Sequence, residues 1–182
     1  MASAIRLSRY LVLAALLIAT LSVYSADVTS PVASTAAVMD FELFDDMSAY
    51  EDRAVMEAEN RRIALISDAL RQELDERGLY RVVDNHAAAG VISDFKARQN
   101  LRDCNGCEID IGKALHADVI VIGWVQKVSN LILNINLQAT DVRTGEVLYA
   151  KSVDLRSNTD QSWLRGIHYM VDSITEDIQR SR

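Results

Sequence analysis

Two cysteines stand three positions apart in the segment Cys104-Asn105-Gly106-Cys107, and the chain contains no others. A pair at this spacing can form a local disulfide, exchange disulfides with another protein, or offer two thiolates to zinc. We predict a structural disulfide first, because the N-terminus described below directs the chain to an oxidising compartment. The main alternative is thiol–disulfide exchange in the service of a periplasmic oxidoreductase.

The surrounding sequence gives little support to the other uses of the cysteines. A thioredoxin-type oxidoreductase carries a proline loop opposite its cysteines, and the only proline here is Pro31, ahead of the first expected strand. Haem attachment needs a histidine directly after the second cysteine, where this chain has Glu108. Zinc would need two more ligands from His86, His116, His168 or carboxylates. A structural role is therefore favoured.

Acidic residues gather at Asp45, Asp46, Glu51 and Asp52. Carboxylates in such numbers are weak candidates for a hard cation, because Ca²⁺ takes six to eight oxygen ligands. The spacing and the glycine of an EF-hand are absent, so a solvated acidic loop is the preferred interpretation. Binding of a cation or a small molecule is kept as an alternative function.

Polar side chains are expected where a buried strand ends and where the last helix begins. This candidate interaction surface comprises Lys127, Ser129, Asn130, Asn158, Asp160, Trp163 and Arg165. Tryptophan and arginine are common among the residues that contribute most to protein interfaces. The structural alternative is that Asn158 or Asp160 caps the helix and that Trp163 anchors it to the sheet.

The chain carries no recognisable enzymatic motif. The nucleophile elbow, the zinc-protease helix and the phosphate-binding glycine loop are all missing. We therefore predict a protein that is not an enzyme, with no catalytic residues and no cofactor.

The first half of the chain should supply a strand, a long helix and a second strand. Apolar and polar residues alternate over residues 36–43, which predicts a strand with one buried face. Residues 53–77 predict a helix that ends at Gly78, and residues 79–84 predict a short strand. The apolar stripe of the helix consists of Met56, Ile63, Ile66, Leu70 and Leu74. The sequence leaves open whether residues 85–103 are ordered before a partner binds.

The second half should begin with a short helix over residues 108–116 and an apolar strand over residues 118–125 that is buried on both faces. Two further strands, 131–140 and 146–155, follow at tight turns, and a final helix starts near Asp160. The stripe of that helix is Trp163, Ile167, Val171, Ile174 and Ile178. The fold class is an α/β sandwich: a mixed sheet of about five strands, with a C-terminal three-stranded antiparallel meander, packed against two long helices.

The N-terminus has the order of a secretory signal peptide. Arg6 and Arg9 precede an apolar run of residues 10–23 that is short for a membrane span. We place cleavage after Ser25, with Ala26 as the second choice and an uncleaved anchor as the alternative. This divides the chain into a signal peptide (1–25), a flexible leader (26–35) and one domain (36–182).

Loss of the two arginines changes the formal charge of −7 to −9. An acidic chain is a poor match for nucleic acid, because phosphate binding depends on clustered lysine and arginine. We also expect no stable membrane insertion after cleavage. The predicted partner is an unidentified periplasmic or envelope protein.

Several segments resemble a known group of bacterial envelope domains. They are similar to the α/β domain shared by the amino-terminal part of TolB, the curli secretion protein CsgG and the LpoB activator of penicillin-binding proteins. The similarity lies in the strand at residues 37–42, the helix that runs into residues 79–84, the segment 117–123 and the hairpin at residues 141–148. Within that group the chain resembles an uncharacterised periplasmic family, DUF2380/DUF3280, through residues 104–107, 125–133 and 158–166. The resemblance implies a non-enzymatic domain of adaptor type. It transfers no catalytic residues.

Overall fold

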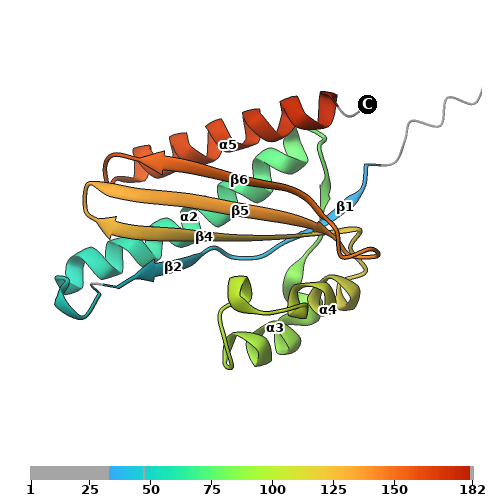
Figure 1. The fold of residues 1–182 in the computed structure, drawn as a ribbon, viewed down its shortest axis with the longest axis horizontal. Helices are drawn as coiled ribbons and strands as arrows, with labels where there is room; N and C mark the ends of the chain where they lie inside the picture. The colour runs from blue at the N-terminus through green and yellow to red at the C-terminus, as the bar shows by residue number, and fades with distance from the viewer. Residues whose placement is uncertain (1–32, 47, 181–182) are drawn as a thin grey trace, which may run out of the picture. The chain divides into compact units, whose positions relative to one another are not determined.

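A mixed sheet of six strands lies at the centre of residues 33–46 and 48–180, the part of the chain that this computed structural model describes. Its order is β3 (Arg81–Val82), β1 (Thr35–Val38), β4 (Val119–Ser129), β5 (Ile132–Asp141) and β6 (Val147–Leu155), while β2 (Glu42–Asp45) pairs with the far part of β4. The strands β1 and β2 run parallel to β4, and β4, β5 and β6 form an antiparallel meander (Figure 1). The predicted α/β sandwich is confirmed.

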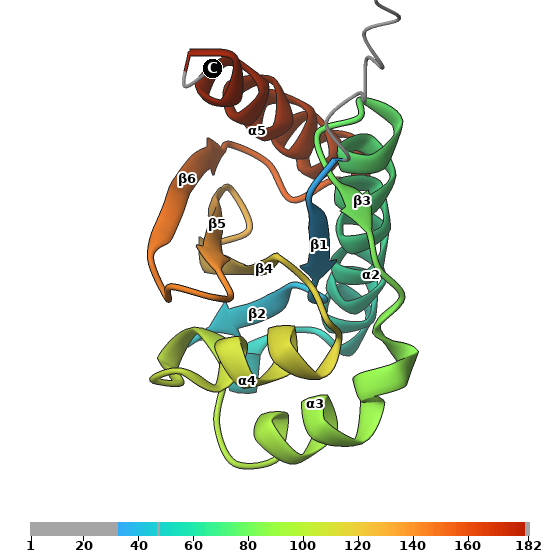
Figure 2. The ribbon, with the colours of Figure 1, turned by 90° about the vertical axis from the view of Figure 1, so that its right-hand side faces the viewer.

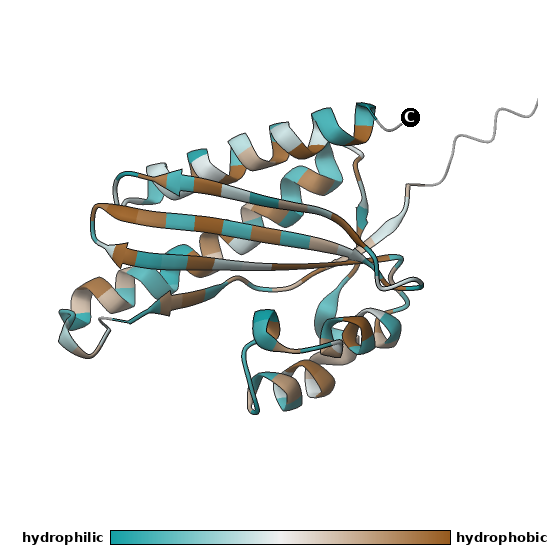
Figure 3. Ribbon diagram, in the orientation of Figure 1, coloured by the Kyte–Doolittle hydropathy of each residue, from teal (hydrophilic) through white to brown (hydrophobic). Residues whose placement is uncertain are grey.

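Helices cover both faces of this sheet, but unequally. The long helices α2 (Arg53–Glu76) and α5 (Asp160–Arg180) pack on one face, and the short helices α3 (Ala89–Lys96) and α4 (Cys107–Ala114) lie against the other (Figure 2). The larger core, under α2 and α5, includes Ile66, Leu70, Ile135, Trp163 and Ile167. The smaller core includes Met39, Leu101, Ile111, Ile120 and Ile122. Brown and teal bands alternate along β5 in Figure 3, as expected for a strand with one buried face.

Helix α2 begins and ends at sequence-encoded signals. The Asp52 carboxylate accepts a hydrogen bond from the backbone N–H of Ala54 at 2.7 Å, which caps the N-terminus. At the other end Gly78 has a φ of 63°, and the N–H of Leu79 donates to the carbonyl of Leu74 at 3.0 Å. This is the Schellman arrangement, so the predicted helix and its stop at Gly78 are confirmed.

The buried stripe of α2 differs from the prediction at its first position. Met56 is exposed, and the side chain buried in the first half of the helix is that of Glu59. A carboxylate can be buried there because a lysine lies against it, as described below.

The strand predicted over residues 36–43 is wrong in one respect, since two strands separated by residues 39–41 occupy this stretch. The N–H of Phe41 leaves the sheet ladder and donates to Ser67 Oγ on α2 at 2.9 Å. The Phe41 ring then lies over Gly123 of β4, where an added Cβ would come within 2.4 Å of Phe41 Cε1. The interruption therefore seats an aromatic ring in the larger core.

Residues 85–103, left open from the sequence, contain the turn η2 (Asn85–Ala88), helix α3 and the turn η3 (Leu101–Asp103). Another short 3₁₀ turn, η1 (Ser48–Tyr50), precedes α2. The elements η2, α3 and η3 join β3 to α4 and contribute Ala88, Ile92, Phe95 and Leu101 to the smaller core.

The predicted signal peptide and most of the predicted leader lie outside the described residues. From Ala33 onward the chain forms one compact unit. Strand β1 begins at Thr35, the last residue of the predicted leader. Among the helices that the structure describes, none has the length and apolarity needed to cross a membrane.

Candidate interaction surface and the Lys127 network

A lysine is buried among three carboxylates where β4 ends. Lys127 Nζ lies 3.1 Å from Asp45 Oδ2, 2.9 Å from Glu51 Oε1 and 2.7 Å from Glu59 Oε1. The side chains of Lys127 and Glu59 are each only 1% exposed. The carboxylates come from β2, the loop before α2, and α2 itself, so one ammonium joins three segments to the sheet.

The electrostatics of this cluster favour the charged lysine. Burial lowers the pKa of Lys127, but the nearby carboxylates of Glu59, Glu51 and Asp45 outweigh that effect and hold the pKa above its ordinary value. One ammonium cannot balance the charge of three carboxylates, so further hydrogen-bond donors are needed to stabilise the remaining negative charge. Asn158 Nδ2 donates to Glu59 Oε1 at 2.6 Å, and Asn130 Nδ2 donates to Glu51 Oε1 at 3.4 Å.

Asn158 extends the cluster to the start of α5. Its Nδ2 also donates to Asn130 Oδ1 at 3.1 Å, and its Oδ1 accepts from Trp163 Nε1 at 3.1 Å and from Arg62 Nη1 at 3.1 Å. We call this set the Lys127 network: Asp45, Glu51, Glu59, Arg62, Lys127, Asn130, Asn158 and Trp163. It fixes the β4–β5 turn, the start of α2 and the β6–α5 loop relative to one another.

The structure brings most residues of the candidate interaction surface to this end of the molecule. Ser129 Oγ accepts hydrogen bonds from the N–H groups of Leu131 and Ile132, at 3.3 and 3.2 Å, and so shapes the β4–β5 turn. Asp160 Oδ1 accepts from Arg62 Nε at 2.7 Å. Arg165 is exposed beside a hollow of about 230 Å³ between β6 and α5.

Two members of the candidate interaction surface are buried, so the prediction that they lie at the surface is wrong. Trp163 is 0% exposed and Lys127 is 4% exposed as whole residues, so neither reaches solvent. Trp163 packs in the larger core, as the anchoring alternative expected, and Lys127 supports the surface from beneath. The remaining residues stay candidates for contact with a partner.

The helix cap at the start of α5 also differs from the expectation. The residue that caps α5 is Thr159, whose Oγ1 accepts from the N–H of Ser162 at 3.2 Å, while Ser162 Oγ accepts from the N–H of Thr159. Asn158 and Asp160 are thereby left for the contacts with Glu59 and Arg62.

The acidic residues predicted as a loop do not act together. Asp45 and Glu51 converge on Lys127, whose ammonium occupies the space among the carboxylates. Asp52 caps α2, and Asp46 is exposed. Two participants, Glu59 and Arg62, were missed from the sequence. The signal for Glu59 was its place four residues before Ile63, on the apolar stripe.

Around the network, apolar side chains face solvent. Of the ten large apolar residues exposed in the described chain, five belong to this end, with Tyr50 84% and Leu131 69% exposed. We call these five the tip: Tyr50, Met56, Val128, Leu131 and Ile132. Next to Leu131 a hollow of about 490 Å³ is lined by Ala54, Val55 and Ala58 of α2, with Arg62 and Asn158 at its polar side.

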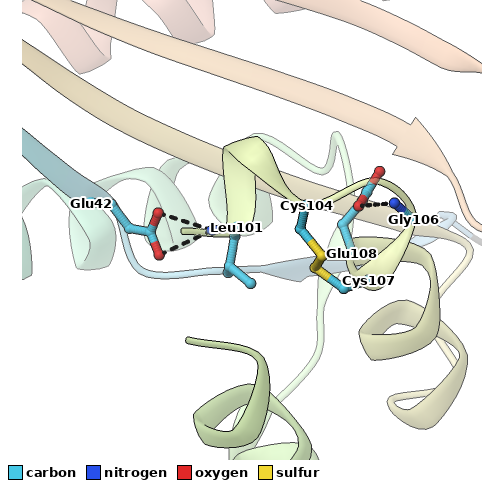
Figure 4. Close-up of a disulfide and its surroundings, with 6 residues drawn as sticks. All are labelled: Glu42, Leu101, Cys104, Gly106, Cys107 and Glu108. Atoms are coloured by element: carbon cyan, nitrogen blue, oxygen red, sulfur yellow. Dashed lines mark hydrogen bonds between the residues drawn. A yellow bond between two sulfur atoms is a disulfide. The ribbon is translucent and has the colours of Figure 1, made fainter. Parts of the chain in front are cut away.

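Cys104 and Cys107 are joined by a disulfide at the start of α4 (Figure 4). Gly106 has a φ of 101°, which glycine adopts readily, and its N–H donates to Glu108 Oε2 at 3.1 Å. Nearby, the Glu42 carboxylate accepts from the N–H of Leu101 at 3.1 Å, which ties η3 to β2. Whether the disulfide is purely structural stays a prediction.

A family model described as "Protein of unknown function (DUF2380)", and named DUF3280, matches residues 34–174. The chain belongs to this family. The match covers both cores, the disulfide and the whole Lys127 network. The family suggested by the sequence is therefore confirmed. No curated protein matches the chain.

Three solved structures align with this chain at low identity. The NMR structure of LpoB from Escherichia coli aligns with a TM-score of 0.50 and 14% identity, over 70% of this chain and 60% of that one. The LpoB C-terminal domain from Salmonella enterica has a TM-score of 0.49 and 14% identity, over 69% and 84%. TolB from Acinetobacter baumannii has a TM-score of 0.49 and 12% identity, over 80% and 28%. At 14% identity the similarity to full-length LpoB concerns the fold alone.

Proposed function

We propose that this protein is an exported, non-enzymatic binding domain that recognises another protein of the bacterial envelope through its tip. The observation that carries the proposal is the concentration of five exposed large apolar side chains at this end, one of which, Leu131, lines a hollow of about 490 Å³. Exposed apolar side chains that gather at one end of a domain are a common mark of a protein interaction site. The disulfide agrees with export to an oxidising compartment.

The Lys127 network supports the proposal because it fixes the backbone on which the tip is carried. Three segments distant in sequence meet there through charged and amide contacts of 2.6–3.4 Å. A surface held in place before binding loses less conformational entropy when a partner docks. The mechanism is recognition by shape and apolar contact, with Asn130, Asp160 and Arg165 offering polar contacts at the rim.

Site-specific photo-crosslinking in the native cell tests this proposal. A photoreactive amino acid is placed at position 131 in the tip and, as the matched control, at position 169, because Tyr169 on α5 is similarly exposed at 66%. We expect a discrete protein adduct from position 131 and none from position 169. The Ile132→Asp substitution should remove the adduct from position 131.

The crosslinked protein then serves as a purified partner for affinity measurement. We expect Leu131→Asp to weaken binding at least about tenfold, since a charge would be buried at a central apolar contact. The Tyr169→Ser control should bind like the wild type. Equal crosslinking from both positions, or full affinity in the Leu131→Asp variant, would rule out the tip as the recognition site.

A further inference from the structure

A second hollow, away from the tip residues, lies where two parallel strands end. Its volume is about 510 Å³, within the range of small-molecule sites in proteins. Met39 follows β1 and Val83 follows β3, so both stand at the carboxyl ends of parallel strands, where open α/β sheets commonly bind ligands. Helix α3 forms the opposite wall with Ala89, Ile92 and Lys96.

Four apolar residues, Met39, Val83, Ala89 and Ile92, line this pocket together with seven polar or charged ones. Most of the charged groups already have partners. Asp40 is paired with Arg71. The Arg71 guanidinium also donates to the carbonyl of Val38 at 3.2 Å and to Asp68 at 3.0 Å, so its donors are committed. The Asp84 carboxylate accepts from the N–H of His86 at 2.9 Å and caps η2.

Lys96 is the exception among the charged groups of the pocket. Its ammonium lies 3.9 Å from Glu42 Oε1, at the limit of an ion pair, and that carboxylate already accepts from the N–H of Leu101. Lys96 can therefore donate to a ligand without giving up a close partner. A cation beside apolar side chains is complementary to an anionic head group on an apolar body.

We infer that this pocket binds a small amphipathic anion, with its apolar body on Met39, Val83 and Ile92 and its carboxylate, sulfonate or phosphate head on Lys96. The site uses none of the tip residues, so it is independent of the proposed protein partner. Because the whole chain is negatively charged, binding of an anion requires specific placement and gains nothing from the overall charge.

Calorimetry with decanoate and with decylammonium, both below their micellar concentrations, tests the inference on the full mature protein. We expect decanoate to bind and decylammonium to bind at least about tenfold more weakly. The Lys96→Gln variant should lose about tenfold or more in decanoate affinity, as expected for removal of a charged hydrogen bond. Lys113→Gln, an exposed lysine on α4, is the matched control and should bind like the wild type.

Two further measurements protect the test from misreading. Ala89→Trp, at an exposed residue of the pocket wall, should block decanoate while leaving the thermal unfolding midpoint within a few degrees of wild type. Methyl NMR shifts on addition of decanoate should appear at Met39, Val83 and Ile92. Wild-type affinity in Lys96→Gln, equal or tighter binding of decylammonium, or shifts at the tip would overturn the inference. So would binding to phosphatidylglycerol vesicles without binding of free decanoate.

Discussion

On one face of the sheet two long helices bury the larger core, whereas on the other two helices of eight residues cover a smaller one. The layer of α2 and α5, here called the first layer, is held at one end by contacts between residues about 30 to 100 positions apart, such as Asn158 with Glu59 and Asn130. The layer of α3 and α4, here called the second layer, contains a disulfide that spans four residues. We expect the first layer to unfold with the whole domain and the second to open locally at lower cost.

The largest expected effect comes from breaking the Lys127 network. Lys127→Met leaves Asp45, Glu51 and Glu59 close together without a cation, which should lower the free energy of unfolding by about 3–5 kcal/mol. Urea denaturation measures this loss. The double variant Lys127→Met/Glu59→Met should be more stable than the sum of the two single losses predicts. Strict additivity would show that the two side chains do not interact.

Packing within the first layer can be tested at Gly123. A Cβ there would overlap the Phe41 ring, so Gly123→Ala should cost about 1–3 kcal/mol. Adding Phe41→Leu should recover part of that loss by removing ring atoms. Stability equal to wild type in Gly123→Ala would mean that the ring does not lie over β4.

The disulfide should matter less, and locally. Replacing Cys104 and Cys107 by serine opens a very short loop, for which chain entropy predicts a loss of about 2 kcal/mol. Hydrogen exchange should accelerate in α4 and η3 while α2 and α5 keep their protection. Uniform acceleration across both layers would contradict the separation of the two faces. Unchanged exchange everywhere, with loss of function in cells, would favour the redox alternative.

The smallest effect is expected at the seam where β1 and β4 begin. The Asp118 carboxylate accepts hydrogen bonds from the N–H and the Oγ1 of Thr35, each at 2.8 Å, and these lower its pKa. A lowered pKa in the folded state contributes stability above about pH 4, and the contribution is lost as the pH falls through the folded value. Asp118→Asn should therefore cost at most about 1 kcal/mol near pH 6 and less at pH 3. Asp94→Asn, at an exposed residue of α3, is the matched control and should keep a stability close to that of the wild type.

The sequence predicted the elements of the first layer well, because local patterns determine them. The apolar stripe ending at Leu74 and the glycine at position 78 define α2, and the alternation in residues 131–140 defines β5. The break between β1 and β2 was missed, since it depends on Ser67 and Gly123, which are remote from it in sequence.

The sequence predicted where the residues of the candidate site lie, but it did not predict which side chains contact one another. Residues at the end of β4 and the start of α5 were expected to share a surface, and Asn130 and Asn158 do touch. The burial of Lys127 could not be foreseen, because it depends on Glu59 from a helix nearly 70 residues earlier in the chain, whereas the burial of Trp163 follows from its place on the apolar stripe of α5. Sequence spacing does not report which distant carboxylate faces a lysine.

The most direct test of the account is hydrogen–deuterium exchange of the mature protein with and without the purified partner identified by crosslinking. We expect new protection in residues 48–58 and 128–133 and at residues 156–160, the segments that carry the tip and its hollow. Protection confined to β6 or to α3, with the tip segments exchanging as in the free protein, would contradict the claim that the tip binds the partner.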